Sequence, residues 1–281
     1  MSYSYHWATA ILVTAVFIAT ALEASASETS PVAKPLRPMC TDRPTKSTSP
    51  CTVDKGHLQI ESDLFNVTVD RGDGMTTTTW LAANPTLKLG LTDTLDAEVN
   101  IAPYVSVLVR DRASGARTHA SGVGDLFLRV KWALLGNDGG SLGFALSPYV
   151  KLPTARSGIG NGAIEVGMIA PIDINLPANW SLVIDPELDL VKNGGDGGRH
   201  LNASGLLSLS RGVSKAVTVS VEVWTDTDFD PVGSRTQVSG DLGLAFVPPR
   251  APDWQIDGGV NLGLNRRTPA AQAYLGVSRR F

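Results

Sequence analysis

The chain is poor in sulfur, in aromatic residues and in long hydrophobic runs. Its 281 residues include 2 cysteines, and aromatic residues make up 6% of the total. Beyond the N-terminal region, no apolar run reaches the roughly 20 residues that a membrane-spanning helix needs. Helix-favouring runs are scarce as well. The formal net charge is −3, which gives no electrostatic footprint for a nucleic acid.

Glycine and an alternating hydrophobic pattern are what the sequence does contain. The 28 glycines gather with proline, asparagine and aspartate in short clusters. Between these clusters, apolar and polar residues alternate, as is typical of β-strands separated by turns. A β-barrel of this length commonly forms one domain. The composition therefore predicts an all-β protein.

Residues 1–26 are predicted to be a secretory signal peptide. An apolar stretch from Ala8 to Leu22 is too short for a spanning helix, and Ala24-Ser25-Ala26 after it has the form of a cleavage site. The region before the stretch has no lysine or arginine. An uncleaved anchor is therefore the alternative.

Residues 27–55 are predicted to form an extended N-terminal segment without a core of its own. This stretch is rich in Pro, Ser, Thr and Lys and has no periodicity. It holds both cysteines, Cys40 and Cys51, and export to an oxidising compartment favours a disulfide between them over free thiols. A metal site is not expected, because two thiols without a nearby cluster of His or carboxylates bind metal poorly. The segment either lies in the periplasm or plugs a lumen.

The last nine residues predict a strand with one apolar face. Val277 and Phe281 share that face, and Ser278 and Arg280 lie on the other. A terminal strand that closes on Phe281 resembles the signal that barrel assembly machinery reads in bacterial outer-membrane β-barrels. Arg279 departs from that signal, although at a membrane edge its stem could lie on lipid and its head in water. The alternative is the C-terminal strand of a soluble sheet.

Residues 56–281 are predicted to form an up-and-down antiparallel transmembrane β-barrel of about twelve strands. Connections after the odd strands are mostly longer than those after the even ones, which fits a barrel with both termini in the periplasm. We expect a bulge at Leu64–Phe65, where the alternation slips, and a polar loop over 111–119.

Aromatic residues at strand ends support the barrel, whereas prolines inside strands count against it. An aromatic girdle at the lipid interface is expected to consist of Trp132, Trp180, Phe246, Trp254 and Phe281. Bulges or strand ends are expected at Pro103, Pro148, Pro171 and Pro186, because proline cannot donate a ladder hydrogen bond.

Several motifs resemble one family. They are Thr41-Asp42-Arg43-Pro44, Gly122-x-Gly124-Asp125 with Arg129 and Lys131, Lys151-Leu152-Pro153-Thr154, Gln255-Ile256-Asp257-Gly258-Gly259-Val260 and the terminal Gly276-Val277-Ser278-Arg279-Arg280-Phe281. Together they resemble the outer-membrane transporters named after the meta-cleavage pathway of phenol degradation, over nearly the whole mature chain. The resemblance implies passage of small molecules, including aromatic or hydrophobic ones, and brings no binding residues with it.

The polar faces of the strands carry many ionisable residues, predicted to line the lumen. These are Glu61, Asp63, Lys88, Asp96, Glu98, Asp125, Arg129, Lys131, Lys151, Glu165, Asp173, Asp185, Glu187, Asp189, Glu222, Asp241, Asp257 and Arg280. They either line a watered path that selects by charge or pair across a narrow lumen and fill it. Among them, Asp185, Glu187 and Asp189 are the strongest candidates for a wall that attracts cations.

The function predicted from the sequence is an outer-membrane channel for passive or facilitated passage of small molecules. A closed structural barrel, a lipid-modifying barrel enzyme and a soluble periplasmic all-β protein are the alternatives. For an enzyme, His119 near Ser121 and His200 near Ser204 are the nearest approach to a catalytic pair, and no G-x-S-x-G turn is present. We therefore expect no catalytic residue, no metal and no cofactor. The expected partners are the outer-membrane bilayer, the assembly machinery and a small solute.

Overall fold

The computed structural model describes residues 35–195 and 197–281. Residues Leu36–Phe281 form one compact unit, and all the strands belong to it. The predicted signal peptide, residues 1–26, and the start of the predicted N-terminal segment lie outside the described residues. No helix among the described residues has the length and apolar character needed to cross a bilayer, a finding that says nothing of a β-barrel.

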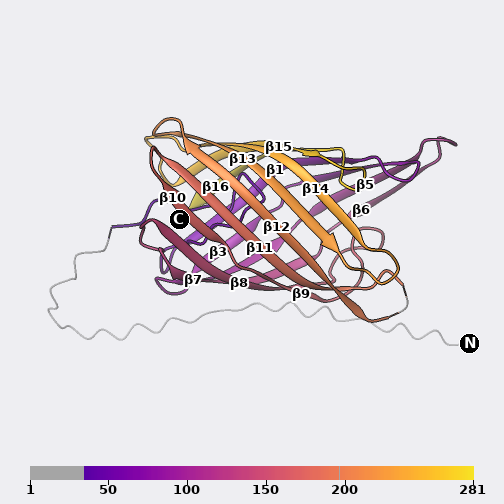
Figure 1. Ribbon diagram of the computed structural model, residues 1–281, viewed down its shortest axis with the longest axis horizontal. Coiled ribbons are helices and arrows are strands. Elements are labelled where there is room, and N and C mark those ends of the chain that lie inside the picture. Colours follow the sequence, from indigo (N-terminus) through magenta and orange to yellow (C-terminus); the bar gives the residue numbers. More distant parts are fainter. Residues whose placement is uncertain (1–34, 196) are drawn as a thin grey trace, which may run out of the picture. The chain divides into compact units, whose positions relative to one another are not determined.

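Sixteen β-segments make up this unit (Figure 1). In chain order they are β1 (Leu58–Asp70), β2 (Met75–Ala82), β3 (Thr86–Gly90), β4 (Leu95–Ile101), β5 (Tyr104–Asp111), β6 (Arg117–Gly122), β7 (Leu126–Leu135), β8 (Leu142–Leu152), β9 (Glu165–Ile169), β10 (Ile172–Leu176), β11 (Trp180–Lys192), β12 (Arg199–Gly212), β13 (Val217–Asp228), β14 (Arg235–Phe246), β15 (Trp254–Gly263) and β16 (Ala271–Arg280).

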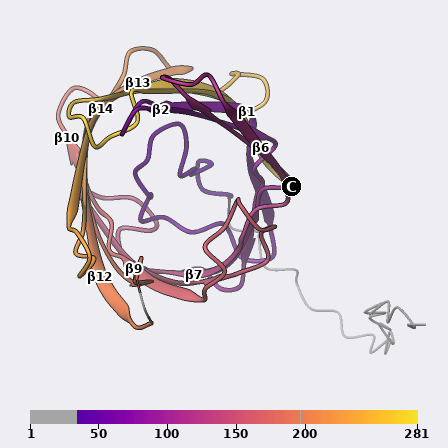
Figure 2. The same ribbon diagram turned by 90° about the vertical axis from the view of Figure 1, so that its right-hand side faces the viewer.

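These segments form a closed antiparallel ring. Each pairs antiparallel with the segments beside it, and β16 pairs with β1 to close the ring (Figure 2). Four barrel strands are interrupted once, so that β2–β3, β4–β5, β6–β7 and β9–β10 are each two halves of one strand. The prediction of twelve antiparallel strands is therefore confirmed.

Proline accounts for three of the four interruptions. Pro85, Pro103 and Pro171 lie between the two halves of their strands, where a missing N–H and a fixed φ break the ladder. Pro148 and Pro186, by contrast, lie inside the continuous strands β8 and β11. The prediction of a strand end or bulge at these two prolines was therefore wrong. The expected slip beside Leu64 is confirmed as a register shift between β1 and β16.

The barrel is apolar outside and polar inside. In β7, Lys131 is 1% exposed, whereas its neighbours Val130 and Trp132 are 41% and 51% exposed. The same alternation runs around the ring, because side chains of a strand point to opposite faces. An apolar outer surface over a charged interior is the arrangement of a barrel in lipid.

The two ends of the barrel differ. Both chain ends of the barrel lie at one end, here called the terminal end, with the turns 91–94, 136–141, 177–179, 213–216 and 247–253. The opposite end, here called the distal end, carries the connections 71–74, 112–116, 153–164, 193–198, 229–234 and 264–270. The expected polar loop over 111–119 is shorter, because Asp111 and Arg117 already belong to paired strands.

The wall has one break in its hydrogen bonding at the distal end. Within the described residues, β6 pairs with β5 only, whereas its continuation β7 pairs with both β4 and β8. The connection 153–164 lies against this free edge, where the Arg156 amide donates to the Val123 carbonyl at 3.3 Å. The outer edge of β6 is thus held by a loop instead of a strand.

Candidate functional site

In the structure, each predicted lumen residue is either buried or half-buried. Those that are buried are Glu61, Asp63, Lys88, Asp96, Glu98, Lys131, Lys151, Asp185, Asp189, Glu222, Asp241, Asp257 and Arg280. Those that are partly exposed are Asp125, Arg129, Glu165, Asp173 and Glu187. Charges so deeply buried are stable only when they are paired. Their partners come largely from the N-terminal part of the chain.

Residues 36–57, here called the lumen segment, run through the inside of the ring (Figure 2). The segment has no regular secondary structure apart from a single bridge between Lys55 and Gly90. Four of its backbone amides donate to carboxylates of four different strands. These bonds join Asp42 to Glu61 at 3.0 Å, Lys46 to Glu222 at 3.0 Å, Thr48 to Asp185 at 2.6 Å and Val53 to Asp96 at 3.0 Å. An irregular backbone inside a barrel needs such acceptors, because its own N–H groups have no ladder.

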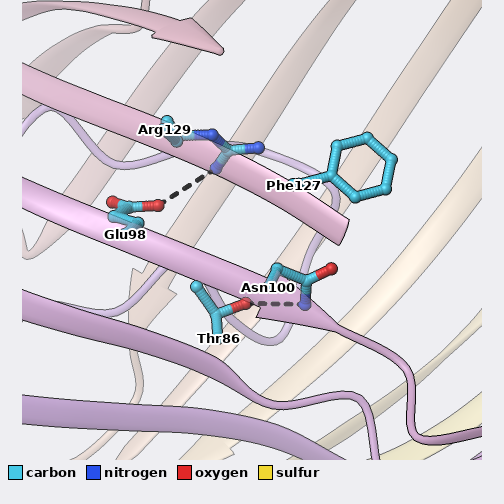
Figure 3. A pocket seen from close by; sticks show the side chains of 5 residues that line it. All are labelled: Thr86, Glu98, Asn100, Phe127 and Arg129. Carbon is cyan, nitrogen blue, oxygen red and sulfur yellow. Dashed lines mark hydrogen bonds and ion pairs between the residues drawn. The ribbon is translucent and has the colours of Figure 1, made fainter. Parts of the chain in front are cut away.

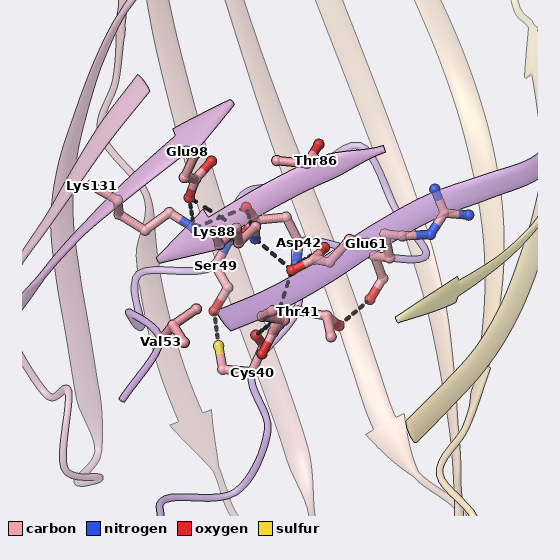
Figure 4. A network of polar contacts seen from close by, with 12 residues as sticks. Cys40, Thr41, Asp42, Ser49, Val53, Glu61, Thr86, Lys88, Glu98 and Lys131 are labelled. Atoms are coloured by element: carbon pink, nitrogen blue, oxygen red, sulfur yellow. Dashed lines mark hydrogen bonds and ion pairs between the residues drawn. The ribbon is translucent and has the colours of Figure 1, made fainter. Parts of the chain in front are cut away.

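Asp42 is the centre of the densest ionic network (Figure 4). Its carboxylate lies 2.5 Å from the Lys88 ammonium and 2.8 Å from that of Lys131. The same two lysines also contact Glu61 and Glu98 of the wall. Two inward lysines on β3 and β7 are thus neutralised by one residue of the lumen segment together with wall carboxylates.

The two lysines also set the ionisation of Asp42. Burial on its own would raise the pKa of Asp42, but the ammonium groups of Lys131 and Lys88 outweigh it and hold the pKa well below its ordinary value. Asp42 is therefore a carboxylate throughout the physiological range.

Three more basic side chains tie the lumen segment to the wall. Arg43 bonds Asp63 at 2.7 Å and Asp257 at 2.8 Å, and so joins β1 to β15. Lys46 pairs with Asp241 at 2.8 Å. Its ammonium also lies 4.5 Å from the centre of the Trp224 ring. At the terminal end, Arg37 donates to the Asp93 carbonyl of the turn 91–94 at 3.2 Å and pairs with Asp54 of its own segment at 2.7 Å.

Arg280 of the last strand joins this terminal network. Its guanidinium contacts Asp54 at 2.9 Å, Asp253 at 2.6 Å and the carbonyl oxygen of Arg37 at 2.7 Å. The C-terminal strand thereby holds both ends of the sequence 37–54.

A disulfide closes the middle of the lumen segment. The structure has the predicted bond between Cys40 and Cys51, which confirms that pairing. Asp42, Arg43 and Lys46 all lie between the two cysteines. The covalent loop therefore presents the main wall-binding side chains together.

Inward glycines make room for this loop. A Cβ added at Gly143 would lie 2.9 Å from the Pro50 ring, and one at Gly243 would lie 2.9 Å from the Pro44 ring. A Cβ at Gly276 would collide with the Arg43 guanidinium, and one at Gly90 with the backbone of Val53 and Asp54. The lumen segment thus touches the wall where side chains are absent.

Space beside the lumen segment remains in several small cavities. One of about 290 Å³ is lined by Thr86, Glu98, Asn100, Phe127 and Arg129 (Figure 3). The Arg129 side chain is 24% exposed and bonds Glu98 at 3.3 Å. It also lies over the Tyr149 ring, which packs against Phe127 at 6.0 Å between ring centres. This cavity combines aromatic surface with a partly exposed cation.

The acids expected to attract cations have partners. Asp185 accepts the Thr48 amide, Asp189 accepts the Tyr149 hydroxyl at 2.7 Å, and Glu187 accepts the Ser204 hydroxyl at 3.3 Å. They lie together along β11, as alternation predicts. Part of the hydrogen-bonding capacity of these three carboxylates is therefore taken up by groups of the protein.

The predicted girdle residues lie near the terminal end. Trp180 and Trp254 begin β11 and β15, Phe246 ends β14, Phe281 follows β16, and Trp132 pairs with the first residue of β4. Arg279, the residue that departs from the assembly signal, places its guanidinium 4.6 Å from the Trp254 ring centre and 4.2 Å from that of Phe281. The cation is covered by the two rings next to it.

His119 and His200 lie near the starts of β6 and β12, and both make ordinary polar contacts. His119 pairs with the Ser106 hydroxyl at 2.8 Å, not with Ser121, at an exposed site. His200 hydrogen-bonds Asn193 at 2.9 Å and pairs with Asp228, and with Asp230 it forms the one group in the described residues that could hold a metal ion. Both of these carboxylates already accept backbone amides of the loop 229–234. Hydrogen bonds among these residues therefore account for the cluster.

Sequence reasoning missed the residues of the lumen segment that bind the wall. Asp42 and Arg43 carried only a motif resemblance, and Lys46 carried no role. Trp224, an inward aromatic residue over Lys46, was also missed. The sequence could have predicted this position, because Trp224 follows Glu222 by two residues in β13 and therefore shares its polar face.

Solved structures of outer-membrane proteins share this fold. The COG4313 outer membrane channel from Pseudomonas putida F1 superposes with a TM-score of 0.61 at 14% identity, covering 81% of this chain and 96% of that chain. The transport unit of the autotransporter AIDA-I from Escherichia coli gives a TM-score of 0.53 at 12% identity, covering 80% and 90%. At such identities the likeness shows the fold alone.

Sequence comparison assigns the family. A search of curated protein sequences gives no significant match. A family model, by contrast, matches residues 41–281, from the lumen segment to the terminal Phe281. The chain therefore belongs to the family described as "MetA-pathway of phenol degradation".

Proposed function

We propose that this protein is an outer-membrane channel for small molecules and that the lumen segment plugs and narrows its path. The observation that carries the proposal is the set of bonds that fixes residues 42–53 to strands all around the ring. Passage then runs through the spaces beside the segment, such as the cavity at Arg129. Spaces of this size admit ions and small solutes.

The proposal includes export and assembly through the sequence signals. Cleavage follows residue 26, and the assembly machinery reads the last strand through Phe281. Removing Phe281 should lower the amount of folded barrel in outer-membrane fractions, read as heat-modifiable migration on a gel. Unchanged assembly would speak against that role for the residue.

Single-channel current in a planar bilayer tests the plug. We compare the mature protein with a variant that lacks residues 36–56, both refolded in detergent. The mature protein should give small discrete steps, and the deletion variant steps several-fold larger, because removing the segment widens the watered path.

A second variant guards against misfolding of the deletion. Cys40→Ser with Cys51→Ser keeps every wall-binding residue but opens the loop between them, and should give larger or noisier steps. Equal conductance in all three proteins, each heat-modifiable, would overturn the plug. Silence of all three would favour a closed structural barrel, and lipid turnover by the folded protein would favour an enzyme.

The break beside β6 supports apolar solutes as the cargo. Within the described residues, the outer edge of β6 has no strand partner, so this part of the wall is the weakest at the distal end. The connection 153–164 covers it with few backbone bonds. A solute with an apolar body could leave the lumen here for the lipid without crossing the network around Asp42.

A further inference from the structure

Five arginines line a cavity at the distal end of the barrel. The cavity has a volume of about 730 Å³, and its arginines are Arg71, Arg112, Arg235, Arg266 and Arg267. Four of them lie in the connections after β1, β5 and β15, and Arg235 begins β14, between β13 and β15 in the ring. We call these five residues the arginine rim.

The rim has a surplus of positive charge. Two aspartates, Asp70 and Asp73, also line the cavity. One ion pair is formed, between Arg235 and Asp70 at 3.9 Å. Among the described residues, the guanidinium groups of the other four arginines have no carboxylate partner and are exposed. Cations gathered around a concave surface raise the local concentration of anions.

This surplus contrasts with the rest of the lumen. Deeper inside, Lys88, Lys131, Arg43 and Arg280 each contact at least one carboxylate. The basic groups there serve the structure, whereas those at the rim remain available to a ligand. Guanidinium groups present paired N–H donors that match a carboxylate or a phosphate.

We propose that the arginine rim is a binding site for the carboxylate or phosphate of an organic anion at the channel mouth. The proposal deepens the proposed function, since the role of the site in passage rests on the channel. An anion with an apolar body suits both parts of the protein. Its charged group would bind the rim, and its body would face the weak wall beside β6.

The position of the rim favours a solute over a lipid headgroup. Arg235 lies in the same phase of β14 as Asp241, which faces the lumen segment. Asp70 is likewise in phase with Thr68 and Asn66 on the inner face of β1. The cavity therefore opens toward the mouth of the barrel and not toward the outer lipid surface.

Binding of benzoate to the refolded protein in an uncharged detergent tests the site, with the dissociation constant measured by NMR titration at low salt. The triple variant Arg112→Gln, Arg266→Gln and Arg267→Gln should bind at least about tenfold more weakly, because three charged donors are removed. The matched control is Arg250→Gln, an exposed arginine in the turn 247–253 at the terminal end. The control should bind as the parent does.

Several outcomes would overturn the site. Equal benzoate binding by the triple variant and the parent would do so, as would an equal loss in the Arg250→Gln control. Lipid A, titrated in the same detergent, separates the two sources of the anion, and binding of lipid A without benzoate would overturn the solute assignment. The assay needs no passage, so a parent that binds benzoate but conducts no current would contradict the channel and leave the site standing.

Discussion

At the scale of single residues, Asp42 decides whether the inner charges of the barrel are balanced. Its carboxylate bridges Lys88 and Lys131, whose side chains are 3% and 1% exposed. Breaking a buried ion pair by removing one partner typically costs about 3–5 kcal/mol. The two lysines keep contacts with Glu61 and Glu98, which places the expected cost near the lower end.

Asp42→Asn should therefore loosen the lumen segment without dissolving the ring. Trypsin should cut after Lys46 faster in the variant, because local release exposes that stretch. Asp93→Asn, at an exposed turn whose side chain does not pair with a lysine, is the matched control. Equal cleavage of variant and control would show that the segment is held by other contacts.

The lowered pKa of Asp42 gives the pH dependence a definite sign. The pKa of the Asp42 carboxyl is lower in the folded protein than in the unfolded chain, where it is about 3.9. Its contribution to the stability of the folded state is therefore fully present above the unfolded-state pKa. That contribution is lost only as the pH falls through the lower folded-state pKa. The segment should hence stay anchored from pH 7 down to about pH 4. The amide NMR signals of Lys46 and Thr48, followed from pH 7 down to pH 4, check this. Release of the segment at pH 5 to 6 would contradict it.

The alternation of residues predicted the inner face but not the partners. The alternating pattern predicts that the side chains of Lys88 and Glu222 point inward, because successive side chains of a strand lie on opposite faces. It does not state that Glu222 would accept the amide of Lys46, because residues 27–55 have no periodicity to place them. The charge excess of the wall was visible in the sequence, whereas its use by an irregular segment depends on three-dimensional register.

At the scale of elements, the lumen segment and the wall are fitted to each other through glycine. Gly243 of β14 faces the Pro44 ring, whereas Gly240 of the same strand meets only the flexible Leu264 side chain at 3.6 Å or more. The two glycines thus differ in what a larger residue would displace.

Gly243→Val should push the loop around Pro44 away from the wall and raise the single-channel conductance. Gly240→Val is the control and should leave the conductance unchanged, because its side chain has room. A ring-disrupting effect would appear as lost heat-modifiability in both variants. Unchanged conductance in a folded Gly243→Val protein would show that the lumen segment accommodates the larger side chain without moving into the solute path.

Strand existence was easier to predict than strand continuity. Long alternating runs predicted the twelve strands, but the break at Pro85, between β2 and β3, was not predicted. Pro186 was expected to interrupt β11 and does not. The neighbouring strand is itself broken opposite it, where Ala170 donates to the Pro186 carbonyl at 3.0 Å. Which proline breaks a strand depends on its neighbour across the sheet.

At the scale of the whole molecule, the ring is complete at the terminal end and incomplete at the distal end. Gly122 ends β6, and a Cβ there would lie 3.1 Å from that of Arg156 in the connection 153–164. This separation is close to that of paired cysteines, about 3.5–4.5 Å. The two positions allow the break to be locked covalently.

Gly122→Cys with Arg156→Cys should lock the connection to β6 when oxidised. Entry of the apolar dye N-phenyl-1-naphthylamine into intact Gram-negative cells should then fall and recover on reduction, while the ion conductance of the oxidised double variant equals that of the oxidised parent. The parent treated with the same oxidant and reductant is the control. Equal dye entry into cells with the oxidised and with the reduced double variant would show that the solute does not pass through the break beside β6.

Arg280 gives the order of assembly a constraint. It lies on β16, which closes the ring against β1, and it also holds Asp54 and the Arg37 carbonyl of the lumen segment. The seam and the anchor of the segment therefore depend on the same side chain. A barrel that closes before residues 37–54 have entered would leave this guanidinium without two of its acceptors. The lumen segment, which is synthesised first, must therefore already lie inside the barrel when the last strand, β16, pairs with β1.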